Sequence, residues 1–122
     1  MATTTMNPPL GAHVCSEANG TLSRETVTIA SGEGVIKAGA VLGKITTGGK
    51  YGWYDNTASD GTQAAVAVNF AEVDATSADV KAVAHVRLAE VWSDRLVWIT
   101  GADSTAKTAG LADLATSYVI AR

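Results

Sequence analysis

Short runs of alternating apolar and polar residues, separated by glycine-rich turns, dominate the chain from residue 24 onward. Residues 25–30 are rich in β-branched side chains, and residues 40–46 repeat this pattern after a Ser/Gly turn. A period of two residues is typical of strands that bury one face. The sequence therefore predicts a mainly β domain built from short strands.

Three later segments extend this prediction. In residues 63–70 small residues occupy one face, which lets another layer approach closely. Residues 80–88 carry an apolar face opposite Lys81, His85 and Arg87, which predicts a half-buried strand with a solvated outer face. Residues 95–99 are apolar on both faces and are predicted to form a central strand.

Turn and helix signals complete the pattern. The Gly48–Gly49 pair can adopt the positive φ of a tight hairpin turn, so residues 51–54 are expected to follow as a strand. Asp103 or Ser104 can cap one short C-terminal helix. Its Gly110 should weaken that helix by about 1 kcal/mol relative to alanine. Residues 118–121 are predicted to be a closing strand.

The first 23 residues have a different character. They show no strand or helix period, and they contain Pro8, Pro9 and several small polar residues. This composition predicts a flexible N-terminal arm over residues 1–23, followed by a single β domain over residues 24–122. The alternative is a tail without a role.

Composition limits the classes of function. The chain of 122 residues fits one domain, with 47% hydrophobic but only 17% charged residues. Soluble domains carry about 25% charged residues, so part of this surface is expected to be covered by partner subunits. The net charge is −3 and the nine basic residues are scattered, which argues against a nucleic-acid partner.

Cysteine use and apolar runs indicate the compartment. Cys15 is the single cysteine, so no internal disulfide can form. The first 23 residues contain no Lys or Arg, unlike a secretory signal, and the apolar runs are too short to span a bilayer. A soluble protein made in a cytoplasm, without a membrane partner, is expected.

Candidate chemistry is sparse. His85 is expected at the surface or an interface, and His13 and Cys15 form a His-x-Cys pair that lacks the further ligands of a metal site. Asp55 and Asp60 flank a loop and are interpreted as turn-stabilising residues. The sequence predicts no catalytic residue, no cofactor and no metal, and hence no enzyme.

The aromatic residues allow three interpretations. Trp53, Tyr54, Trp92 and Trp98 are candidates for the core, for an oligomer interface, or for a sugar-binding platform. The pattern alone does not decide among them.

Four segments, taken in order, carry a resemblance. Residues 35–46 are followed by residues 54–65, in which an Asp-rich turn ends in Asp60–Gly61 before an alanine-rich strand. Residues 96–98 and 118–120 then follow at similar spacing. In this order, residues 24–122 resemble head decoration proteins of the phage lambda type.

The resemblance implies a compact β-clip-like fold and a structural role. Such proteins form homotrimers at three-fold and quasi-three-fold positions of the expanded head. There they hold neighbouring major capsid proteins together against the pressure of packaged DNA. A protein of this type lies on the outer surface of the virion and is synthesised in the cytoplasm of the bacterial host.

Two sets of site residues are expected under this hypothesis, within a shell contact that covers residues 6–29. The capsid-binding set is Met6, Asn7, Pro8, Pro9, Leu10, Val27 and Ile29. The trimer-interface set is Trp53, Tyr54 and Trp92. The alternative hypothesis is a carbohydrate-binding or adhesive β module on a virion surface that uses those three aromatics.

Overall fold

The computed structural model describes residues 12–18 and 22–122. In chain order these residues form β1 (Val14–Glu17), β2 (Arg24–Ile29), β3 (Gly34–Ile36), β4 (Val41–Lys44), β5 (Tyr51–Trp53), β6 (Ala65–Asn69), β7 (Val73–Ala75), β8 (Val80–His85), β9 (Ala89–Val91), a 3-10 turn (Ser93–Arg95), α1 (Ser104–Thr116) and β10 (Val119–Ala121). The mainly β architecture with one C-terminal helix is therefore confirmed.

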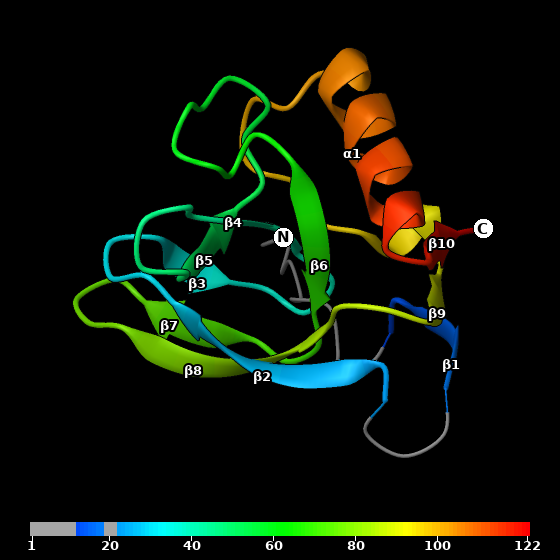
Figure 1. Cartoon of the computed structure of the whole chain (residues 1–122), viewed down its shortest axis with the longest axis horizontal. Coiled ribbons are helices and arrows are strands. Elements are labelled where there is room, and N and C mark those ends of the chain that lie inside the picture. The colour runs from blue at the N-terminus through cyan, green and yellow to red at the C-terminus, as the bar shows by residue number, and fades with distance from the viewer. Residues whose placement is uncertain (1–11, 19–21) are drawn as a thin grey trace, which may run out of the picture.

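A closed barrel in the strand order β2-β5-β4-β6-β8 forms the body of the molecule (Figure 1). β2 pairs with β8 in antiparallel fashion along its whole length, and a parallel bridge between Ile29 and Tyr51 connects it to β5. The predicted hairpin joins β4 to β5, and both Gly48 and Gly49 have positive φ. β3 and β7 form a separate antiparallel pair.

A small three-stranded sheet lies beside the barrel, under the lower end of α1 (Figure 1). β9 is its central strand, with β1 antiparallel on one side and β10 parallel on the other. The first and last described strands of the chain therefore meet on one short strand.

The core has two parts. The first is made mainly by barrel strands and the β3–β7 pair, and contains Val27, Ile29, Ile36, Ala40, Leu42, Ala67, Ala75, Ala82 and Ala84. The second joins the barrel to α1 and the small sheet, and contains Val41, Tyr54, Ala65, Val68, Val91, Leu96, Leu114 and Val119. β4 and β6 contribute to both parts, which fits the small residues predicted on one face of β6.

Helix α1 begins where the sequence indicated. The Asp103 carboxylate accepts a hydrogen bond from the amide of Ala106 at 2.8 Å, as an N-cap residue does. Gly110 is buried, and a Cβ there would lie 2.8 Å from ring atoms of Trp98 and Tyr54. The glycine that lowers helix propensity therefore lets α1 pack closely against two aromatic rings.

Residues 95–99 do not form the predicted central strand. The segment starts in the 3-10 turn, and a single parallel bridge connects Val97 to Ala40. Leu96 is buried in the second core. The apolar run thus reflects packing between the barrel and α1 and not membership of a sheet.

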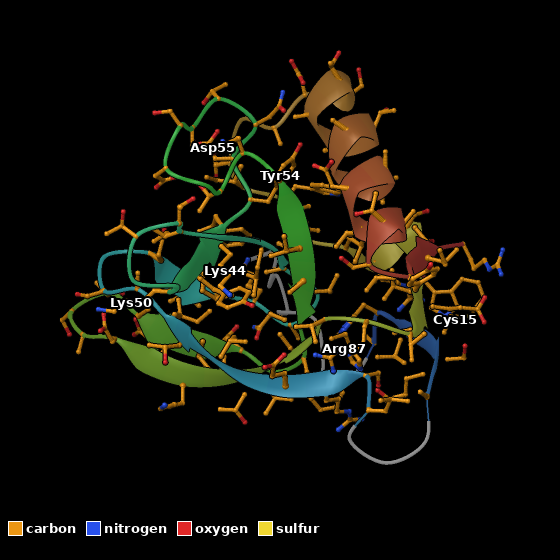
Figure 2. The ribbon with its side chains drawn as sticks, in the orientation of Figure 1. Cys15, Lys44, Lys50, Tyr54, Asp55 and Arg87 are labelled. Atoms are coloured by element: carbon orange, nitrogen blue, oxygen red, sulfur yellow. The ribbon has the colours of Figure 1, made fainter. Side chains whose placement is uncertain are left out.

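Tyr54 connects the barrel to α1, and Figure 2 shows it beside the upper end of β6 next to the helix. Its hydroxyl donates a buried hydrogen bond of 2.8 Å to the carbonyl of Ala106. Tyr54→Phe should lower the free energy of unfolding by about 1 kcal/mol, because one buried hydrogen bond is lost. Urea unfolding measures this, with Tyr118→Phe at an exposed tyrosine as the control. Equal stability of both variants would contradict the role of the Tyr54 hydroxyl.

Candidate functional site

Strand β1 fixes the N-terminal segment to the small sheet. The amide of Trp92 donates to the carbonyl of His13 at 2.8 Å, and the amide of Ala18 donates to the carbonyl of Leu88 at 3.1 Å. His13 therefore lies beside the end of β9. Figure 2 places Cys15 on this side of the molecule, near the C-terminus.

This geometry corrects the boundary of the predicted arm. Val14–Glu17 is a paired strand, and His13 and Ser23 are buried, so these positions belong to the folded domain. The composition of the segment concealed this because the partner strand lies more than seventy residues later. Residues 1–11 and 19–21, and with them Met6–Leu10 of the expected capsid-binding set, lie outside the described residues.

A polar cluster joins β1 to the barrel. The Glu17 carboxylate accepts two hydrogen bonds from the guanidinium of Arg24, at 2.6 and 3.0 Å, and also contacts Nε2 of His85. Bidentate hydrogen bonds between an arginine and a carboxylate are stronger than hydrogen bonds between neutral groups. The hydrogen bond from Arg24 lowers the pKa of Glu17 to about 2, against an opposing effect of burial, with His85 contributing in the same direction as Arg24.

His13 lies at the inner side of this cluster. Its ring is 1% exposed and packs edge-on against His85, with the ring centroids 5.6 Å apart. Neither of its ring nitrogens has a hydrogen-bond partner among the described residues. Burial, assisted by the nearby His85, lowers the pKa of His13 to about 4, although Glu17 opposes this shift.

His85 was expected at the surface or an interface, but it is enclosed within the folded subunit. Its side chain is fully buried, because β1 and Glu17 cover the face of β8 that alternation assigned to solvent. Phe70 adds to this cover, at 5.5 Å between ring centroids.

Three large apolar side chains are exposed near the small sheet. They are Leu88, Trp92 and Tyr118, and Tyr118 is the most exposed at 67%. Leu88 and Tyr118 also have left-handed backbone, with φ of 52° and 61°. The amide of Ala89 donates to the carbonyl of Tyr118, so the two strained residues lie next to each other before β9 and β10. Each such conformation costs a bulky L-residue about 1–2 kcal/mol.

This exposed set was only partly foreseen. Trp92 was expected at an interface, whereas alternation placed Leu88 on a buried strand face and Tyr118 in the closing strand. A single tyrosine or leucine carries no sequence signal for positive φ, so the pattern could not have singled out these two residues.

The other expected site residues lie elsewhere. Val27 and Ile29, which were expected in the capsid-binding set, have their side chains buried in the barrel core. Tyr54, which was expected at the trimer interface, is buried against α1 within the subunit. Trp53 is half-buried, and its Nε1 donates to the carbonyl of Glu33 at 3.1 Å.

The aromatic platform of the carbohydrate hypothesis is not assembled. Trp53 and Trp98 line a surface hollow of about 300 Å³ that also includes Val35 and Lys37. Tyr54 is buried, and Trp92 is not part of this hollow. The three aromatics that were grouped for sugar binding therefore do not share one surface.

Ionisable groups elsewhere have structural roles. Asp55 and Asp60 accept hydrogen bonds from the backbone and hydroxyl of Thr57 and Thr62 respectively, which confirms their interpretation as turn residues. In the part of the chain that the structure describes, no group of three or more His, Cys, Asp or Glu side chains is arranged to hold a metal ion. No helix among the described residues is long and apolar enough to cross a membrane.

Comparison with known protein families gives the assignment. The family model described as bacteriophage lambda head decoration protein D matches residues 3–119. The chain belongs to this head decoration family. A search of curated proteins found no match.

Membership of the head decoration family confirms the resemblance seen in the sequence. The match also extends across β1 and into the N-terminal segment, where no sequence pattern had been recognised. The chain is thus a phage head decoration protein, a structural protein that associates with the capsid of the virion.

Proposed function

We propose that this protein binds as a homotrimer to the outer surface of the expanded phage head, at three-fold and quasi-three-fold sites. There it stabilises the shell against the pressure of packaged DNA by holding neighbouring major capsid proteins together. The observation that carries the proposal is the family match over residues 3–119.

The subunit contact is assigned to the exposed apolar side chains of the small sheet, Leu88, Trp92 and Tyr118. Aromatic anchors are enriched at the centres of protein interfaces, where they contribute most of the binding energy. Strained backbone persists where the surroundings hold it, and it concentrates at functional positions. Both features favour this face over other exposed parts of the described surface.

The capsid contact is assigned to Met6–Leu10 in the segment that precedes β1. An extended peptide can add a strand to an exposed sheet edge, with main-chain hydrogen bonds giving affinity. The root of that segment lies beside β9 and the exposed set, so trimer contact and shell contact would be neighbours.

Light scattering after size exclusion tests the oligomeric state. We expect three times the chain mass of 12.5 kDa for the wild type. Trp92→Ser should raise the trimer dissociation constant about 30-fold, equivalent to about 2 kcal/mol for a buried interface tryptophan. Val35→Ser, at an equally exposed residue of β3, is the control. Equal effects of the two substitutions would contradict the assigned interface.

Expanded heads that lack decoration protein test the function itself. Wild-type protein should bind them saturably and raise the temperature at which they release DNA, because a ligand that binds only the intact shell stabilises it. Failure to bind, together with quenching of tryptophan fluorescence by a glycan, would favour the carbohydrate-binding alternative.

A further inference from the structure

The cluster that joins β1 to the barrel contains a buried base without a hydrogen-bond acceptor. His13 is enclosed, and neither ring nitrogen has a partner among the described residues. The ring nitrogen Nδ1 of His85 is also unpaired there. A proton on His13 would thus create a buried cation with nothing to accept its hydrogen bonds, and such a charge is unfavourable.

The charged and titratable groups around His13 come from three strands. His85 faces it from β8 and Glu17 from β1, and Arg24 on β2 completes the cluster over the ring of Phe70 at 4.1 Å. The Glu17 carboxylate is already engaged by Arg24 and His85. Its charge is therefore largely compensated before His13 takes up a proton.

Strand β1, which directly follows His13 and contains Glu17, is the easiest part of the cluster to detach. β1 is an edge strand of four residues, and its pairing with β9 is interrupted by a register shift between Val14 and Ser16. Short edge elements open locally at lower free energy than central strands. The barrel strands β2 and β8, by contrast, are paired along their length.

We propose that His13, His85, Glu17 and Arg24 form a pH-sensitive latch that holds β1 against the barrel and opens when His13 is protonated. The opened state frees the root of the N-terminal segment while the barrel remains folded. The latch is a property of the fold and does not depend on the proposed capsid function.

The direction of the pH effect follows from the lowered pKa of His13. Its pKa is lowered from 6.5 to about 4 in the closed state, so the open state binds the proton more tightly. The closed state has its full stability above pH 6.5 and loses it progressively as the pH falls toward 4. The lowered pKa of Glu17 acts below 4.5 only, because its ordinary value is 4.5. Measurements between pH 7 and 5 therefore lie above the ordinary pKa of Glu17, and a variant without the His13 imidazole identifies the contribution of His13.

Amide hydrogen exchange tests the latch. Protection factors, corrected for intrinsic exchange rates, should fall roughly 20-fold between pH 7 and pH 5 for the amides of Val14–Glu17 and Trp92. The reason is that opening of β1 is coupled to the uptake of one proton by His13. The protection factors of β2 and β8 should remain constant. In His13→Phe, which keeps an aromatic ring and cannot be protonated, protection of β1 should be independent of pH.

Three results would overturn the latch. The first is constant protection of β1 in the wild type, and the second is an equal loss of protection in His13→Phe. The third needs no variant: the ring protons of His13 followed by NMR in the folded protein should titrate well below 6.5, and a midpoint at or above that value would show that His13 is not enclosed as described.

Discussion

Gly43→Ala should destabilise the domain severely. The wild-type glycine lies in β4, at the centre of the barrel, between β5 and β6. A Cβ there would lie 2.6 Å from Cα and 2.7 Å from the carbonyl oxygen of Thr62. Contacts this short with backbone atoms cannot be relieved by a change of rotamer, so either the strand or the loop must move.

The loop has little freedom to move. The amide and hydroxyl of Thr62 both donate to Asp60, and its carbonyl accepts from the amide of Asp55 at 2.9 Å. Overpacking in a well-packed core costs about 1–3 kcal/mol when side chains can adjust. With backbone on both sides we expect more than about 3 kcal/mol, a large part of the typical 5–15 kcal/mol stability of a domain.

Gly52→Ala provides the matched control. Gly52 is the cross-strand partner of Gly43, and both are strand glycines without positive φ. The added Cβ at position 52 would meet the carboxylate end of Glu33, a flexible side chain that can turn aside. Chemical unfolding should place Gly52→Ala within about 1 kcal/mol of the wild type. Equal loss in both variants would contradict the backbone clash at Gly43.

Local signals in the sequence predicted the regular parts of the fold. The hairpin between β4 and β5 followed from Gly48–Gly49, and the start of α1 from Asp103, because turn and cap geometry depend on neighbouring residues. The alternation in residues 25–30 predicted β2, and it also placed Val27 and Ile29 on one face. That face is the barrel core, which alternation alone does not distinguish from a face buried against a partner.

Long-range pairing explains most of what the sequence did not predict. β1 exists because β9 lies beside it, and four residues without a clear period carry no local sign of that partner. The surroundings of His85 come from β1, β2 and residue 70, so alternation within β8 alone placed it in solvent. Tertiary packing overrode local pattern at the same positions that form the proposed latch.

Removing residues 1–11, with a start methionine in their place, should abolish tight binding to expanded heads. The deletion ends before His13, so β1, its pairing with β9 and the latch remain intact. A longer deletion through residue 23 would remove the buried Ser23 and the whole of β1, and any loss of binding could then result from unfolding. The shorter variant should keep the thermal stability and oligomeric mass of the wild type.

The expected loss is large because, in the proposed trimer, three N-terminal segments would bind the head together. Linked weak contacts raise avidity by about 10²–10⁴, so the apparent dissociation constant should rise at least about 100-fold. A second deletion, of residues 1–5 only, retains Met6–Leu10 and should bind like the wild type. Co-sedimentation with heads measures both variants. If the 1–11 deletion bound with wild-type affinity as an intact trimer, the shell contact would lie on the folded domain, and the exposed face of the small sheet would be the next surface to substitute.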